Sequence, residues 1–128
     1  ASFPSPVLSS THHLHGPEDV AYMAVEEGLG RDKLIVSSFY NHSVLILDAA
    51  TGQLVEVLQG PGLEGPMGLA VDSVDGSILV TSYRSSSVCR FAAGGSYAGI
   101  AMASKELVGP SAVMVMDDSS ALVASYET

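Results

Sequence analysis

The chain is poor in the residues that serve as cross-links and in those that bind nucleic acid. Its 128 residues include one cysteine, Cys89, no tryptophan, and five lysines and arginines against 14 aspartates and glutamates. A single cysteine excludes an internal disulfide. The net charge of −9 argues against nucleic acid and against anionic membrane as partners, because both favour clustered basic side chains.

Long apolar runs and helical patterns are also missing. The longest aliphatic run, 112–116, covers about five residues, whereas a membrane-spanning helix needs about 20. No segment of about ten residues or more carries an apolar stripe with the helical period. Glycines such as Gly94 and Gly95 would each weaken a helix by about 1 kcal/mol. We therefore expect almost no helix and no membrane insertion.

What the chain does contain is a repeat. Apolar residues make up 47% of it and charged residues 15%, which is a globular composition of a length that suits one domain. Gly-Pro occurs at 16–17, 65–66 and 109–110, and a leucine precedes each glycine by two residues. Each unit later ends an apolar stretch with a serine and an aromatic residue, and these serines are Ser38, Ser82 and Ser125. A recurring unit of about 45 residues is typical of repeat architectures.

Within each unit, short apolar segments alternate with turn residues, as in strands. We expect strands near 19–25, 34–39, 43–48 and 53–58, and again near 67–72, 77–83, 87–92 and 96–102. Asp75-Gly76 and Gly94-Gly95 are expected hairpin turns. Four antiparallel strands per repeat describe a propeller blade. The fold class predicted is all-β, an open, partial β-propeller of four-stranded antiparallel blades in which Val36, Val80 and Val123 occupy equivalent positions.

The repeat also divides the chain. Residues 1–15 are assigned to the tail of a preceding blade or to a leader, 16–62 to the first blade, 63–108 to the second, and 109–128 to the first two strands of a third. Val7 and Leu8 align with Val57 and Leu58, which predicts an outer strand there. The absent initiator methionine and the incomplete blade count suggest a piece of a longer protein. The missing blades would come from the same polypeptide or from other copies.

The units resemble NHL repeats. Residues 65–91, GPMGLAVDSVDGSILVTSYRSSSVCRF, resemble the family pattern of Gly-Pro, apolar strand, acid, DG-type turn, second apolar strand and polar linker. Asn41-His42 resembles the family's Asn-His, and Ser38, Ser82 and Ser125 stand where the family usually has aspartate. The resemblance implies a propeller of about six blades. It also implies a binding scaffold whose mouth takes a protein, peptide or glycan ligand.

A second, shorter resemblance concerns a metal. Leu63-Glu64-Gly65-Pro66 resembles the start of the SMP-30/gluconolactonase-like propellers, whose glutamate is a calcium or zinc ligand. It makes Glu64 a candidate ligand for Ca²⁺ or Zn²⁺. The alternative function is therefore part of a metal-dependent lactonase or a related propeller lyase. Because Ca²⁺ takes six to eight oxygens, we expect no tight binding by this chain alone. No catalytic residue and no organic cofactor is predicted.

Three acids, Glu26, Asp72 and Asp117, follow the first apolar stretch of each unit. They would form either a ring of carboxylates at one mouth of the propeller or, as we favour, acceptors of backbone hydrogen bonds in the hairpin that follows. The repeated Ser38, Ser82 and Ser125 have no histidine base at matching spacing, so we expect them to satisfy backbone groups. The aromatic residues that follow them, Phe39, Tyr83 and Tyr126, are expected to pack between blades.

The four histidines are His12, His13, His15 and His42. On an extended segment His13 and His15 share a face that could hold zinc or copper, but no carboxylate or thiol in the leader completes such a site, so we favour a solvated connector. Cys89 lies in an apolar strand and is expected to be buried and inert.

Overall fold

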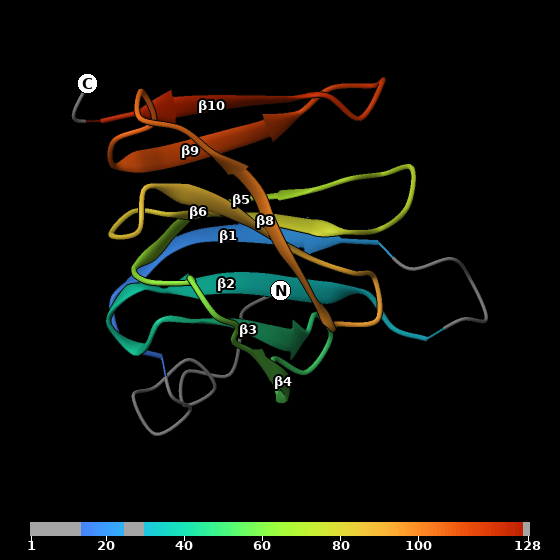
Figure 1. The fold of residues 1–128 in the computed structure, drawn as a ribbon. Coiled ribbons are helices and arrows are strands. Elements are labelled where there is room, and N and C mark those ends of the chain that lie inside the picture. Colours follow the sequence, from blue (N-terminus) through green and yellow to red (C-terminus); the bar gives the residue numbers. More distant parts are fainter. Residues whose placement is uncertain (1–13, 25–29, 127–128) are drawn as a thin grey trace.

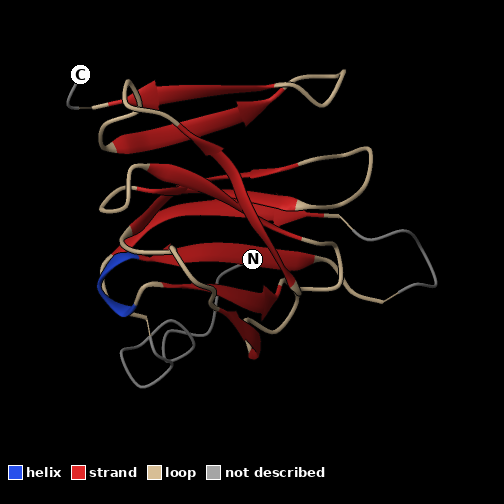
Figure 2. Cartoon of the chain, in the orientation of Figure 1, coloured by secondary structure: helices blue, strands red, loops and turns tan. Residues whose placement is uncertain are grey.

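A computed structural model describes residues 14–24 and 30–126, and within these ranges the chain is built from strands and turns (Figures 1 and 2). The first sheet contains β1 (Pro17–Met23), β2 (Lys33–Ser38), β3 (Ser43–Asp48) and β4 (Leu54–Leu58). The second contains β5 (Pro66–Val71), β6 (Ile78–Ser82), β7 (Ser87–Phe91) and β8 (Tyr97–Ala103). The third contains β9 (Pro110–Val115) and β10 (Ala121–Ser125). The one helix in the described ranges is a 3₁₀ turn, Phe39–Asn41, and no described helix is long and apolar enough to cross a membrane.

Each sheet is an antiparallel meander, and the sheets are stacked with their faces packed together, β9–β10 at the top of Figure 1 and β1–β4 at the bottom, along an arc. The first strand of the second sheet, β5, contacts both β1 and β9, so the first strands of the three sheets follow one another along the inner edge of this arc. We call β1–β4 the first blade, β5–β8 the second, and β9–β10 the half-blade. The sheets do not close into a barrel. The chain is thus an open, partial β-propeller with four-stranded antiparallel blades, as the sequence predicts.

Strand pairing confirms the predicted equivalence of three valines. Val36, Val80 and Val123 pair with residues that each lie three positions after the proline of the repeat: Val20, Leu69 and Val113. Pairing is irregular directly after that proline in all three units. The Gly-Pro is therefore the point at which every inner strand begins. The predicted outer strand at Val7 and Leu8 lies outside the described residues.

The same register corrects the alignment of the three acids. Asp72 lies six positions after the proline of its unit, and the matching residues of the other units are Met23 and Met116. Asp117 lies seven positions after its proline and therefore does not share the position of Asp72. Glu26 lies outside the described residues. Asp72 itself has the predicted turn role, since its carboxylate accepts the Val74 N–H at 2.9 Å.

The core lies between the blades. Its largest cluster joins Ile35, Val44, Ile46 and Leu58 of the first blade to Leu69, Ile78, Val80, Cys89 and Phe91 of the second, with Leu63 between them. A further cluster joins Leu79, Val88 and Leu107 to Val113, Val115, Ala121 and Val123. Successive residues of a strand point to opposite faces, so Val80 packs towards the first blade and Leu79 towards the half-blade. Each full blade is thus apolar on both faces.

Carboxylates hold the hairpin turns. Asp48 accepts the N–H groups of Ala50 and Thr51 at 2.8 and 3.0 Å. Asp75 accepts the N–H and the hydroxyl of Ser77 at 2.9 and 2.7 Å, in the turn predicted at Asp75-Gly76. These hydrogen bonds lower both pKa values, led by the Thr51 N–H for Asp48 and by the Ser77 hydroxyl for Asp75. The carboxylate form is therefore the one that the fold favours.

We expect Asp75→Asn, which keeps the acceptor oxygen, to lower the melting temperature at neutral pH. A folded-state pKa below the unfolded value of about 3.9 gives stability that is present above that value and is lost as the pH falls through the folded one. The difference from the wild type should therefore shrink as the pH is lowered from about 5 to about 2.5. Circular dichroism melts over this range measure it. A difference that stays constant with pH would show that the charge of Asp75 contributes nothing.

Candidate binding site at the mouth of the arc

Each unit builds the same backbone arrangement where its inner strand begins. The glycine before the proline is left-handed in every unit, with φ of 72° at Gly16, 66° at Gly65 and 60° at Gly109. Glycine adopts this conformation without a Cβ clash, which explains the repeated Gly-Pro. The carbonyls of these glycines accept the N–H groups of Phe39, Tyr83 and Tyr126 at 2.9, 3.0 and 2.9 Å. Main-chain bonds thus fix one aromatic residue beside the start of each inner strand.

The repeated serines complete this arrangement in the two full blades. The Ser38 hydroxyl accepts the His15 N–H at 2.8 Å and donates to the His15 carbonyl at 3.2 Å. The Ser82 hydroxyl likewise accepts the Glu64 N–H at 2.7 Å and donates to the Gly62 carbonyl at 2.9 Å. Both serines are fully buried. The predicted backbone role is confirmed for Ser38 and Ser82, and for Ser125 it stays a prediction.

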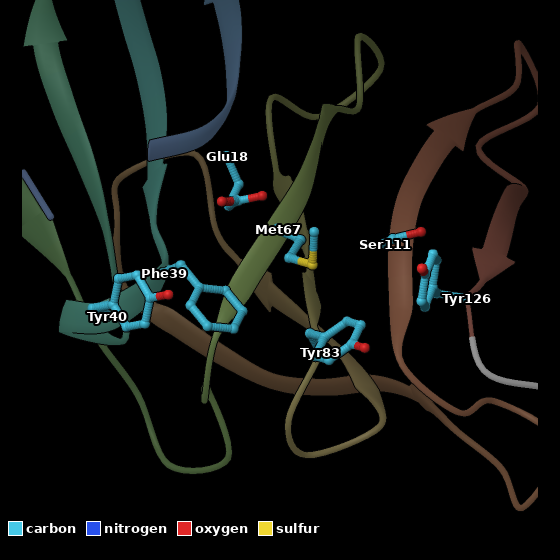
Figure 3. A pocket seen from close by; sticks show the side chains of 7 residues that line it. All are labelled: Glu18, Phe39, Tyr40, Met67, Tyr83, Ser111 and Tyr126. Atoms are coloured by element: carbon cyan, nitrogen blue, oxygen red, sulfur yellow. The ribbon is translucent and has the colours of Figure 1, made fainter. Parts of the chain in front are cut away.

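An open cavity of about 320 Å³ lies at this end of the arc, and we call it the aromatic mouth. Its lining consists of Glu18, Phe39, Tyr40, Met67, Tyr83, Ser111 and Tyr126 (Figure 3). Six of these seven residues come from only two positions of the repeat. One position follows the proline and carries Glu18, Met67 and Ser111. The other follows the repeated serine and carries the three anchored aromatic residues.

The aromatic rings bridge the first two blades. The Phe39 and Tyr83 centroids are 6.2 Å apart, and Phe39 also meets Tyr40 edge to face at 5.1 Å. The expected packing between blades is thus confirmed for Phe39 and Tyr83. Tyr126 differs, because it lies directly after β10 of the half-blade and is 75% exposed. The rings of Phe39, Tyr83 and Tyr126 therefore line the cavity and are not buried in the core.

Adjacent acids on β1 have different roles. Asp19 joins two blades, since its carboxylate accepts the Leu69 N–H of β5 at 2.9 Å. The Glu18 carboxylate lies at the mouth with the Phe39 and Met67 side chains (Figure 3), and it makes no hydrogen bond or ion pair with any residue that the structure describes. Sequence reasoning missed Glu18, Asp19, Tyr40 and Met67. The signal that could have found the mouth is position in the repeat, because Glu18, Met67 and Ser111 share no chemistry.

Glu64 lies outside the lining of the mouth. Its side chain is exposed, and its carbonyl accepts the Arg84 N–H at 3.0 Å. It occupies the same position as His15, whose carbonyl accepts the Tyr40 N–H at 3.1 Å. Within residues 14–24 and 30–126, no three His, Cys, Asp or Glu side chains are grouped to hold a metal ion. Glu64 as a ligand of Ca²⁺ or Zn²⁺ stays a prediction.

The described histidines, His15 and His42, contact neighbouring residues of the protein, and Cys89 is buried. The His15 ring lies 5.1 Å from the Tyr40 ring, and His42 Nδ1 accepts the Gly65 N–H at 3.0 Å. His12 and His13 lie outside the described residues, so a metal site at His13 and His15 stays a prediction. Cys89 is fully buried, as expected, and burial raises the pKa of its thiol. The reactive thiolate is therefore disfavoured at neutral pH.

Comparison with known proteins identifies the fold alone. No family model and no curated protein sequence matches the chain. Among solved structures, the chain is similar to hydrazine synthase of Kuenenia stuttgartiensis, with a TM-score of 0.74 and 21% sequence identity over 89% of this chain. The match spans 30% of the length of the hydrazine synthase chain.

Proposed function

We propose that the chain is an NHL-like β-propeller segment that acts as a binding scaffold, with the aromatic mouth as its ligand site. The observation that carries the proposal is that six of the seven residues lining the mouth stand at the same two positions of the repeat. One position is aromatic in every unit, and the other carries Glu18, Met67 or Ser111. Aromatic rings supply large contact areas at low entropic cost, whereas a variable position supplies specificity. A protein, peptide or glycan segment suits such a surface.

The NHL-like assignment draws support from His42. This residue of the Asn-His pair adopts a left-handed conformation, with φ of 52°, and its ring accepts the N–H of Gly65 in the next unit. His42 thus connects one blade to the Gly-Pro of the following one. Further blades, from the same polypeptide or from other copies, would extend the mouth around the axis.

A peptide-display library and a glycan array, each probed with the full chain, test the proposal. We expect the ligands selected to bind a Tyr83→Ala, Tyr126→Ala double variant about tenfold more weakly, because truncated aromatic anchors are the usual binding hot spots. Tyr22→Ala is the control. Tyr22 is exposed on β1, near the end away from the mouth, and its hydroxyl donates a hydrogen bond to the Asp32 carboxylate. Ligands that bind all three proteins equally would place the ligand site elsewhere.

A further inference from the structure

The geometry points to an organic cation, an alkylammonium or guanidinium group, as the ligand chemistry of the aromatic mouth. The inference rests on the proposed function, since it names what that site binds. The first observation is the density of aromatic rings, which are Phe39, Tyr40, Tyr83 and Tyr126. Aromatic faces carry partial negative charge and attract a cation that lies within about 6 Å of the centroid.

The protein's own Arg84 shows that these rings accept a cation. Its guanidinium carbon lies 4.9 Å from the Phe39 centroid and 6.0 Å from the Tyr40 centroid. Arg84 belongs to the second blade and both rings to the first, so this contact crosses between units. Arg84 is not part of the lining of the mouth. Phe39 and Tyr40 thus hold a cation of the second blade and also line the cavity.

Glu18 supplies the charge complement. It is the one acidic or basic side chain that lines the mouth, it is exposed, and no described residue pairs with its carboxylate. Figure 3 shows it on the inner strand above the aromatic rings, in the same space as Met67. A carboxylate beside aromatic faces favours ammonium and guanidinium over neutral or anionic groups. The net charge of −9 further raises the local concentration of cations.

The same chemistry could come from a small free amine or from a lysine or arginine side chain of a peptide. Methyl NMR of the full chain, labelled with ¹³C at its five methionine methyl groups, separates these sources. Met67 reports on the mouth, and the other four methionines are internal references. The probes are choline, its neutral isostere 3,3-dimethyl-1-butanol, acetate, and the capped peptides Gly-Lys-Gly and Gly-Arg-Gly, all at equal ionic strength.

We expect choline or the basic peptides to shift the NMR signal of the Met67 methyl group until binding saturates. The neutral isostere should bind at least about fivefold more weakly. Tighter binding of a basic peptide than of choline would identify a protein side chain as the source, and the reverse would identify a free amine. Glu18→Gln should weaken cation binding about fivefold and leave the isostere unchanged. Tyr126→Leu should weaken it about threefold.

Asp117→Asn is the matched control, because it removes one negative charge from an exposed residue after β9, at the end opposite Ser111. It should leave cation binding unchanged. Equal binding of choline and its isostere, equal losses in the Glu18 and Asp117 variants, or no response of Met67 to any cation would overturn the inference. The proposed function would survive that result if peptide or glycan ligands still required Tyr83 and Tyr126.

Discussion

Replacing Phe91 by alanine should lower the free energy of unfolding by about 3–5 kcal/mol, the usual cost of truncating a buried phenylalanine. Phe91 is completely buried on β7, and its ring lies 5.3 Å from that of Tyr97. It belongs to the cluster that holds the first two blades together. Alanine would therefore leave a cavity walled by both blades, which neither blade can fill by moving alone.

Urea unfolding followed by circular dichroism measures this loss. Val74→Ala is the control, because Val74 is 72% exposed in the β5–β6 turn, and its truncation should change the free energy of unfolding by less than about 0.5 kcal/mol. A Phe91→Ala protein as stable as the Val74 variant would mean that the two blades do not share this core in solution.

Replacing Gly68 by alanine should destabilise the fold by about 1–3 kcal/mol, the typical cost of overpacking. A Cβ on this residue of β5 would lie 2.7 Å from the Ala112 Cα and 2.9 Å from the Ser111 carbonyl oxygen on β9. Both contacts are with backbone atoms, so no side chain can rotate away. The inner strands of the second blade and the half-blade would have to separate.

The matched control is Gly94→Ala, in the hairpin before β8. A Cβ there meets nothing within 4 Å, so this alanine should cost less than about 0.5 kcal/mol. Parallel denaturation curves of the two variants test the contrast. Equal stability of the two variants would show that β5 and β9 are not in close contact. It would also contradict the placement of Met67 and Ser111 side by side at the mouth.

Much of the fold is predictable because turn chemistry and apolar alternation agree. The expected hairpin at Gly94-Gly95 forms as a turn in which Gly95, with φ of 95°, donates its N–H to the Ala92 carbonyl. The error at Asp117 has a definite cause. Acids were aligned with acids, whereas the register is set by the Gly-Pro, and counting from it places Met116 rather than Asp117 opposite Asp72. The hairpins that follow also differ in length by one residue. Turn length is a local property that a repeat does not preserve.

The mouth was harder to predict from the sequence. Phe39 and Tyr83 were singled out, but as packing residues, because a strand pattern does not reveal which end of a blade faces a cavity. Glu18 was missed because its counterparts Met67 and Ser111 are chemically unlike it. Their shared place directly after the Gly-Pro relates the three residues, and their contact with one cavity shows what that position lines. Comparing repeat units by residue type identifies the positions that keep a structural role. It misses positions whose side chains differ chemically between units.

The bond from each aromatic N–H to a glycine carbonyl uses main-chain atoms alone. The residues at 18, 67 and 111 can therefore be exchanged without altering what holds the inner strands in place. If the aromatic mouth binds a ligand as proposed, exchanging the residue at one of these positions would change the chemistry of the lining in one unit and leave the main-chain anchoring of the inner strands intact. Duplication of a unit followed by substitution at this one position would then add a blade that presents a different side chain at the mouth.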